Sequence, residues 1–339
     1  MNEFAAAARD QRAALFIKTG LRMDLAAPIV EKDFWVCWLL KQLFTMKELE
    51  GWLVFKGGTS LSKCFNLIPR FSEDVDLAVD FEKLGFSGEK DPRRPDLSHT
   101  KREPLLRRMM ASCQEYIAGP FLAAVRLRIS EILASSRWAL QVSTADANTI
   151  EFTYPTALDT GLAYVKPKVL LELGTHAEPI PRHPYILRPF AAEQFPNLFA
   201  EPACPVMTVV ARRTFWEKAT ILHAEYHRPL DKPLLQRYSR HYADVAAMAQ
   251  APVKNEALAD LGLLQDVVRH KDRFYHCGWA RYFEATPGTF RLAPRNERIA
   301  DLRQDLASMQ VMYFGTPPTF DGVMERLAQL EQEINGLPL

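Results

Sequence analysis

The sequence is poor in the residues that mark a cross-linked or zinc-bound protein. Its 339 residues include five cysteines, which are widely spaced and contain no CxxC pair. Neither a disulfide framework nor a zinc site is therefore expected. A strong net charge is missing too, because 42 basic residues face 41 acidic ones and the formal net charge is +1. Composition predicts no overall attraction to nucleic acid or membranes, so any polyanion site must be local.

Long hydrophobic runs are also missing, and we expect no secretory leader. The most apolar stretch, FWVCWLL at 34–40, is too short to span a bilayer. The first residues, MNEFAAAARDQRAALF, lack the basic start and small-residue cleavage site of a signal peptide. We therefore expect a cytoplasmic protein with reduced cysteines and no membrane partner.

Apolar residues make up 48% of the chain, which is enough for an ordered core. Hydrophobic periodicity predicts two N-terminal helices followed by a region of strands and short helices. The helices are predicted at 3–17, 29–49, 59–67 and 102–136, the last interrupted near Gly119 and Pro120. The strands are predicted at 52–55, 75–81, 138–144, 149–155 and 164–174, the last three in a mostly antiparallel sheet.

Irregular and helical segments make up the rest of the chain. A loop is predicted at 85–101 and a proline-rich irregular region at 176–205. Beyond a boundary near 208–215 the pattern becomes helical, with helices predicted at 212–226, 234–249, 255–273, 297–313 and 319–335. This change predicts two domains, 1–210 and 211–339.

Two aspartates, Asp74 and Asp76, lie at i and i+2 at the start of the strand predicted at 75–81. Residues at this spacing project from one face of a strand, about 7 Å apart, while Val75 and Leu77 take the other face. Two such carboxylates can hold Mg²⁺ (or Mn²⁺) jointly with substrate phosphates. A solvated strand face also uses aspartates, so the pair alone leaves both interpretations open.

A glycine-rich turn precedes these aspartates. Gly57 and Gly58 follow a predicted strand, and Thr59 and Ser60 begin a predicted helix, so backbone N–H groups and hydroxyls could surround a phosphate. The spacing matches neither the P-loop GxxxxGK[ST] nor the dinucleotide-binding GxGxxG. A ligand-free strand-to-helix turn would show the same pattern. Two lysines flank the turn and could contact phosphates: Lys56 and Lys63.

The order of these motifs resembles the nucleotidyltransferase toxins of the AbiEii/AbiGii family, within the DNA polymerase β-like superfamily. GG[TS]xL is followed some fifteen residues later by RFSxDVDL. EKDFWVCWLL at 31–40 resembles the EKD helix of the family. FWEKATIL at 215–222 and RHYADV at 240–245 resemble its lysine and aspartate motifs. The likeness covers roughly residues 28–250.

The resemblance implies roles for individual residues. Those implied to hold a nucleoside triphosphate are Gly57, Gly58, Thr59 and Ser60. Those implied to bind Mg²⁺ are Asp74 and Asp76. A third carboxylate is expected on a neighbouring strand, with Glu172 as the candidate, Glu151 as its competitor, and an ordinary salt-bridged glutamate as the alternative. The residues implied to complete the site from the C-terminal region are Lys218 and Asp244.

Lys218 lies in an apolar helical stretch, where an unpaired ammonium would be costly, so it needs a partner. An ion pair between Lys218 and Asp244 that only fixes structure is the alternative to a catalytic role. Helical spacing would place Arg237, Arg240 or His241, and Asp244 on one face. His241 departs from the family, whose members often have an acidic residue at that position.

The segment HKDRFYHCGWARYF at 270–283 is outside the resemblance. Its basic and aromatic residues could neutralise and stack on RNA, or they could form an ordinary solvated face.

Together these features predict an α/β (α+β) protein with a nucleotidyltransferase-fold mixed sheet, flanking helices and a C-terminal helical lobe. The expected reaction is transfer of a nucleoside monophosphate from an NTP to an RNA acceptor. By resemblance, that acceptor is the tRNA 3′ end, and the protein is the toxin of a toxin–antitoxin or phage-defence pair with a cognate antitoxin. One alternative is a transferase acting on a protein or small molecule. Another is a non-catalytic nucleotide-binding regulatory module.

Overall fold

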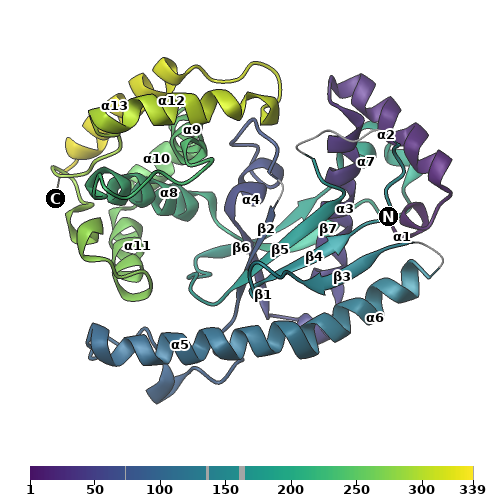
Figure 1. Cartoon of the computed structure of the whole chain (residues 1–339), viewed down its shortest axis with the longest axis horizontal. Coiled ribbons are helices and arrows are strands. Elements are labelled where there is room, and N and C mark those ends of the chain that lie inside the picture. Colours follow the sequence, from purple (N-terminus) through teal and green to yellow (C-terminus); the bar gives the residue numbers. More distant parts are fainter. Residues whose placement is uncertain (73, 135–136, 160–164, 339) are drawn as a thin grey trace. The chain divides into compact units, whose positions relative to one another are not determined.

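The computed structural model describes residues 1–72, 74–134, 137–159 and 165–338. Its strands form one mixed seven-stranded sheet in the order β3-β4-β5-β2-β1-β7-β6 (Figure 1). Their bounds are Leu53–Lys56 (β1), Asp74–Val79 (β2), Ala139–Val142 (β3), Thr149–Thr153 (β4), Lys168–Gly174 (β5), Arg182–Leu187 (β6) and Cys204–Val209 (β7). The predicted mixed sheet is confirmed.

In the sequence, α-helices precede the strands, lie between them and follow them. Their bounds are Asn2–Ala5 (α1), Arg9–Met23 (α2), Ala27–Thr45 (α3), Gly57–Lys63 (α4), His99–Tyr116 (α5), Leu122–Ile132 (α6), Phe190–Gln194 (α7), Ala211–His227 (α8), Ser239–Met248 (α9), Val253–Leu258 (α10), Leu261–Phe274 (α11), Ile299–Ser308 (α12) and Phe320–Asn335 (α13). The interruption predicted near Gly119 and Pro120 is a π-helical segment, Ile117–Phe121, between α5 and α6.

The chain forms two compact units. The sheet unit comprises residues 1–64, 71–91 and 107–209, and the helical unit comprises residues 65–70, 92–106 and 210–339. Two short segments from the N-terminal part of the chain thus belong to the helical unit. The division into domains 1–210 and 211–339 stays a prediction.

The main core of the sheet unit lies on one face of the sheet. Val75 and Leu77 of β2 are fully buried there, together with alternate residues of β5, and α3 packs against β5 and β7. The helix α3 is apolar on nearly all sides, because it is enclosed by the sheet on one side and by α2 and α7 on another. The opposite face of the sheet carries a small apolar cluster of Val54, Ala78 and Val209.

Two strands fall within or next to the region predicted to be irregular at 176–205, and that prediction is wrong for β6. Pro184 lies inside β6, and proline cannot donate to a ladder. β6 nevertheless forms because, among the residues that the structure describes, it is the last strand of the sheet and pairs only with β7. The predictions that reached residues 135–136 and 164 extend outside the described residues; within them, α6 ends at Ile132 and β5 begins at Lys168.

Two acidic residues of α3 bind chain segments outside the helix. Glu31 and Asp33 lie beyond its first turn. Glu31 accepts hydrogen bonds from the Thr156 hydroxyl and the Ala157 N–H, and Asp33 accepts one from the Phe190 N–H. Both residues are buried and fix chain segments distant in sequence.

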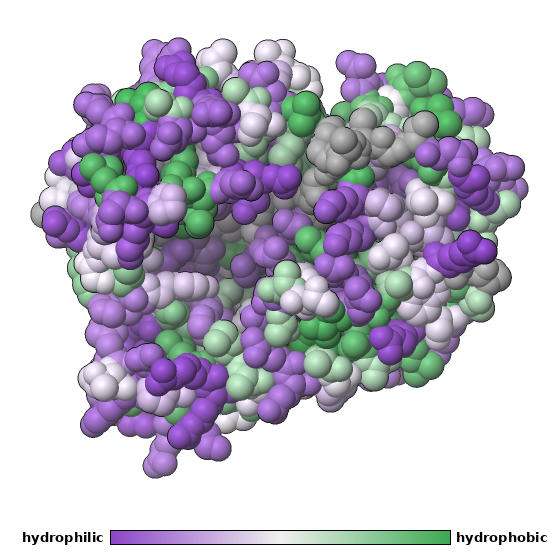
Figure 2. Space-filling model, in the orientation of Figure 1, coloured by the Kyte–Doolittle hydropathy of each residue, from purple (hydrophilic) through white to green (hydrophobic). Residues whose placement is uncertain are grey.

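The helical unit is built around α8. This helix buries Phe215 and Trp216 and packs against α9, α10 and α11, while α13 packs against α9 (Figure 1). No helix among the described residues combines the length and apolarity needed to cross a bilayer. In the view of Figure 2, hydrophilic side chains predominate on the helices of this unit, with smaller apolar patches between them.

Candidate active site

Three carboxylates lie on the face of the sheet opposite the main core. Asp76 of β2 is in register with Glu172 of the parallel strand β5, and Asp74 is two residues before Asp76 on the same face. Registered partners project from one face of a sheet, so the three side chains share that face. Both aspartates are half-buried and Glu172 is exposed. Glu172 therefore lies on the same face as the two aspartates, and this face is accessible to solvent.

Gly57 is the point at which the glycine turn meets these carboxylates. Its φ is +76°, a conformation that glycine adopts without strain. A Cβ at this position would overlap the Asp76 carboxylate. The missing side chain therefore allows Asp76 to lie directly against the start of α4.

The two hydroxyls of the turn are engaged within the protein. Thr59 and Ser60 are buried. The Thr59 hydroxyl donates to the Asp74 backbone carbonyl, and the Ser60 hydroxyl donates to the Gly57 carbonyl at 2.9 Å. In this conformation the Thr59 hydroxyl joins α4 to β2, and the Ser60 hydroxyl closes the first turn of α4. What the turn offers to an anion is the backbone N–H groups of Gly57 and Gly58, since the N-cap residue makes no side-chain cap.

The two lysines that flank the turn differ in their surroundings. Lys56 Nζ lies 4.0 Å from Asp76 Oδ1 and the side chain is 26% exposed, so it borders the open face. Lys63 Nζ lies 2.7 Å from Asp33 Oδ1 and 3.8 Å from the centre of the Phe190 ring. Burial alone would lower the pKa of Lys63, but Asp33 outweighs it and the pKa is raised. Lys63 thus links α4 to α3, the helix of the EKD motif.

Glu151, the competitor of Glu172, is occupied by neighbours on the sheet. Its carboxylate accepts a hydrogen bond from the Ser143 hydroxyl at 3.1 Å and lies 3.0 Å from Lys168 Nζ. The hydrogen bond from Lys168 lowers the pKa of Glu151. Register places Glu151 opposite Leu170, one strand further from Asp76 than Glu172 is. The geometry favours Glu172 as the third carboxylate.

The helical unit holds a second charged cluster, which lies between α8, α9 and the segment 65–70. Lys218 Nζ lies 2.8 Å from Asp244 Oδ2. Arg70 binds the same carboxylate in a bidentate manner. Its Nε lies 2.7 Å from Oδ1 and its Nη2 lies 2.8 Å from Oδ2. The structure thus forms the ion pair between Lys218 and Asp244 that stood as the alternative to a catalytic role, and Arg70 is a third member that the sequence did not indicate. A catalytic role for Lys218 and Asp244 stays a prediction.

This cluster is almost completely shielded from water, with Asp244 and Arg70 only 1% and 3% exposed in their side chains. Burial alone would raise the pKa of Asp244, but Arg70 and Lys218 outweigh it and hold the pKa well below its usual range. His241 lies close by, and burial, reinforced by Lys218, lowers its pKa well below the usual value. A neutral His241 adds no third positive charge to the pair of cations.

The predicted common face of Arg237, Arg240 and Asp244 is not formed as expected. The helix α9 begins at Ser239, and Arg237 precedes it with a φ of +59°. The Arg237 N–H donates to Asp305 Oδ1 at 2.7 Å, which fixes the turn before the helix. Arg237 therefore has a place in the turn and not on the helix face of Asp244.

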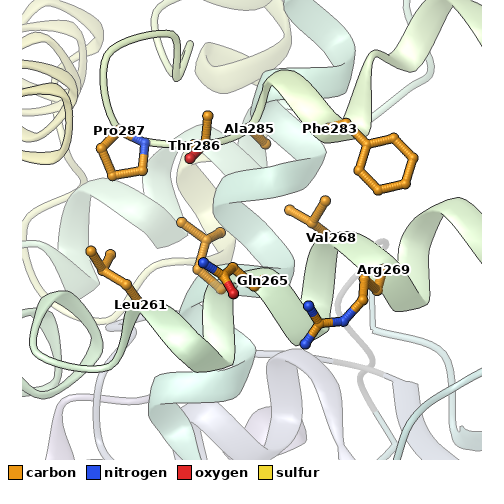
Figure 3. Close-up of a pocket in the computed structure, with 9 residues that line it drawn as sticks. Leu261, Gln265, Val268, Arg269, Phe283, Ala285, Thr286 and Pro287 are labelled. Carbon is orange, nitrogen blue, oxygen red and sulfur yellow. The ribbon is translucent and has the colours of Figure 1, made fainter. Parts of the chain in front are cut away.

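A pocket of about 350 Å³ lies elsewhere in the helical unit, beside α11 (Figure 3). Its walls are mostly apolar, with Leu261, Val268 and Phe283 facing across it and Arg269 at one end. None of the residues predicted to form the active site lines this pocket.

Comparison with known proteins identifies the family. The family model described as nucleotidyl transferase AbiEii toxin, type IV toxin–antitoxin system, matches residues 38–326. The chain belongs to this family. The chain is thus a nucleotidyltransferase toxin of the AbiEii type, and membership implies a nucleotide substrate and an antitoxin partner. A search of curated proteins finds no significant match.

Among solved structures, this AbiEii-family chain is similar to MenT4, a nucleotidyltransferase toxin from Mycobacterium tuberculosis H37Rv. The sequence identity is 16% and the TM-score is 0.51, and the match covers 98% of this chain and 91% of the other. At this identity the likeness shows a shared fold, and the predicted fold class is confirmed.

Arg70 is the residue that sequence reasoning missed. It stands in the RFSxDVDL motif, four residues before Asp74, but periodicity carries no signal for a buried ion pair between positions 174 residues apart. The only signal in the sequence was that Arg70 belongs to the same motif as Asp74 and Asp76.

Proposed function

We propose that this AbiEii-family toxin transfers a nucleoside monophosphate from an NTP to the 3′-hydroxyl of an RNA acceptor, and that the acceptor is tRNA. The observation that carries the proposal is the placement of Asp74, Asp76 and Glu172 on one open face beside the Gly57 turn. The choice of tRNA rests on the likeness of motifs described above.

The donor set of this face suits Mg²⁺, or Mn²⁺ in its place. Carboxylate oxygens are the ligands that Mg²⁺ prefers, and it is commonly held by one or two carboxylates together with substrate phosphates. Bound there, the metal would neutralise phosphate charge and polarise the phosphorus that is attacked. Asp74 and Asp76 would hold it, and the absent side chain at Gly57 leaves room for the Asp76 carboxylate beside the nucleotide.

The reaction forms one bond and breaks another. The oxygen of the acceptor hydroxyl attacks the α-phosphorus, and the bond from that phosphorus to the bridging oxygen of pyrophosphate breaks. The hydroxyl proton would pass to the Glu172 carboxylate, and pyrophosphate leaves with the electron pair. Backbone N–H groups at the start of α4 and the ammonium of Lys56 would orient the triphosphate, so that catalysis comes mainly from positioning and electrostatics.

Lys218 and Asp244 are included as positioning residues. Their ammonium and carboxylate bind each other and Arg70 in a shielded cluster, and Arg70 leads directly into the strand that carries Asp74 and Asp76. The cluster would hold the start of the RFSxDVDL motif in place.

The test is a labelling assay with purified protein, Mg²⁺, total tRNA and each α-labelled NTP in turn. Wild-type protein is expected to label tRNA, and Asp74→Asn and Asp76→Asn are expected to lose at least about 10²-fold in rate, since each removes a charge needed at the metal. Asp80→Asn is the matched control: Asp80 follows β2 and accepts a hydrogen bond from the Glu82 N–H, which asparagine can also accept. It should label tRNA at the wild-type rate.

The labelled species separates the proposal from its alternatives. Label in protein or in a small molecule, with none in RNA, would select a different acceptor. Tight NTP binding without turnover on any acceptor would select a regulatory module. Equal labelling by wild type and Asp74→Asn would contradict the assigned site. The proposed place of this toxin in phage defence, and in the cytoplasm, is tested in cells by infection and fractionation.

A further inference from the structure

A cluster of three metal-binding side chains lies in the helical unit, outside the residues assigned above. His99 is the first residue of α5, Asp272 lies in the last turn of α11, and His276 follows two residues after the end of that helix. One ligand atom from each residue lies within 4.8 Å of the other two. All three belong to the helical unit, although 173 positions separate His99 from Asp272 in the chain.

The distances in this cluster are close to those of a coordination sphere. Asp272 Oδ2 lies 3.4 Å from His99 Nε2, and Asp272 Oδ1 lies 3.0 Å from His276 Nδ1. Two ligand atoms of a tetrahedral ion with bonds of about 2.1 Å are roughly 3.4 Å apart. The distances from the Asp272 oxygens to the two ring nitrogens are therefore close to those between ligand atoms around a bound ion.

The two histidine side chains are partly exposed, so a metal ion can reach them from solvent and their rings can reorient around it. The His99 and His276 side chains are 45% and 48% exposed, and that of Asp272 is 15% exposed. The two rings stack with centroids 3.7 Å apart, so one ring must rotate for both to face a common ion. Rotation about χ1 and χ2 is inexpensive for a half-exposed side chain.

The chemistry of the ligands selects the class of metal. Two imidazole nitrogens and one carboxylate suit Zn²⁺ and its neighbours in the transition series, whereas Mg²⁺ prefers oxygen ligands throughout. Arg102 interacts electrostatically with Asp272 and with Arg273. The positive charge of these arginines repels a cation, so a metal bound at Asp272 only through electrostatic attraction would be disfavoured. The balance favours a metal that gains from bonding to imidazole.

From this geometry we propose that His99, Asp272 and His276 form a binding site for a divalent transition metal, with Zn²⁺ the best fit. Three protein ligands leave the fourth position of a tetrahedral ion to water. The ion would clip the start of α5 to the end of α11. The site is independent of the proposed nucleotidyl transfer, because it uses none of the same residues.

The experiment is a titration of the full-length, metal-stripped protein with ZnCl₂, followed by calorimetry. Wild type is expected to bind one equivalent at this site. His99→Ala, His276→Ala and Asp272→Asn should each weaken binding at least about tenfold, since changes in even the outer shell of a metal site cost 10–100-fold. His183→Ala is the matched control, because His183 is an exposed histidine of β6 that lies outside the cluster.

Two further measurements keep the result specific. Titration of Asp74→Asn/Asp76→Asn protein should leave the Zn²⁺ affinity of the cluster unchanged, and millimolar Mg²⁺ should not displace the ion. Replacing Zn²⁺ with Co²⁺ should give visible absorption bands that are lost in His99→Ala/His276→Ala protein. The proposal is overturned if wild type binds no Zn²⁺, or if the double variant binds Zn²⁺ as tightly as wild type.

Discussion

At the scale of single residues, Gly57 is the position where the absence of a Cβ allows both the backbone conformation and the placement of the Asp76 carboxylate. Its φ of +76° disfavours any residue with a Cβ, and the space a Cβ would take is filled by the Asp76 carboxylate. Any other residue at position 57 would therefore strain the backbone and would push the Asp76 carboxylate out of its place.

The Gly57→Ala variant tests this argument against Gly85→Ala. Gly85 has a φ of +86°, but a Cβ there would meet no atom within 4 Å. Gly85→Ala should cost only the backbone strain, about 1 kcal/mol, and keep full activity. Gly57→Ala should cost about 1–3 kcal/mol more through the steric conflict, and it should reduce nucleotidyl transfer because Asp76 must move. The measurements are urea unfolding and the tRNA labelling assay.

Equal losses of stability and activity in the two glycine variants would show that strain alone matters at Gly57. The comparison is informative because both positions share the positive φ, and a Cβ would meet the Asp76 carboxylate only at Gly57.

Residue types in the sequence predicted part of this site. The spacing of Asp74 and Asp76 predicted their common face, and the resemblance named Glu172 as the candidate on a neighbouring strand, which is β5. The sequence pattern could not show which of the polar side chains would bind groups of the protein itself and so be unavailable to a ligand. Thr59 and Lys63 bind partners that folding brings close, the Asp74 carbonyl and the Asp33 carboxylate, and Ser60 binds the carbonyl of Gly57 in its own helix.

At the scale of elements, the buried cluster of Arg70, Lys218 and Asp244 joins α8, α9 and the segment 65–70. Two cations share one carboxylate, so the cluster depends on the charge of Asp244. Removing one partner of a buried ion pair leaves an uncompensated charge and costs about 3–5 kcal/mol.

Asp244→Asn should therefore destabilise the protein by about 3–5 kcal/mol at pH 7, because both cations stay buried. Lys218→Met should cost less, since Arg70 still neutralises Asp244. Lys254→Met is the control within the same unit: Lys254 pairs with Glu333 at 2.8 Å, but both side chains are partly exposed, at 23% and 31%. Its effect should stay below about 1 kcal/mol. Urea unfolding gives all three values.

The pH dependence of the same variant has a definite sign. The folded pKa of Asp244 lies below its unfolded value of about 3.9. Its charge therefore stabilises the folded state above that value, and the contribution is lost as the pH falls toward the folded pKa. The gap in unfolding free energy between wild type and Asp244→Asn should shrink from pH 7 to pH 3. A constant gap would contradict the assignment of the lowered pKa.

Elements were predicted best where one pattern dominated. Gly119 and Pro120 marked the break between α5 and α6, and the break is a π-helical segment. β6 escaped prediction because its sequence, RHPYIL, has a proline and exposed residues at alternate and adjacent positions. Its strand conformation comes from pairing with β7, a contact between chain segments that local periodicity does not report.

At the scale of the whole molecule, charge is nearly balanced, and this limits how an RNA substrate can be held. With a formal net charge of +1, long-range attraction to a polyanion is weak. RNA contacts should be concentrated in local patches. The helical unit offers one such surface, where Arg228 and Lys232 lie over Trp279, with their charged groups 5.8 and 5.6 Å from the ring centre.

Salt dependence of tRNA binding measures the size of that patch. Each phosphate neutralised contributes about −0.7 to −0.9 to the slope of log K against log salt concentration. If about three or four phosphates are contacted, the slope should be roughly −2 to −4. Fluorescence anisotropy of labelled tRNA with Asp76→Asn protein, which binds without turnover, provides the measurement over a series of KCl concentrations.

Double-stranded DNA is the control for this titration, because it offers a denser array of phosphates without a 3′-terminal RNA single strand. A protein that reads a local feature of tRNA should bind such DNA far more weakly at every salt concentration. A slope steeper than about −6, or equal affinity for DNA, would mean that a broad basic surface dominates. That result would contradict the inference from net charge and move the search for the RNA site from single side chains to the arrangement of charge over the whole helical unit.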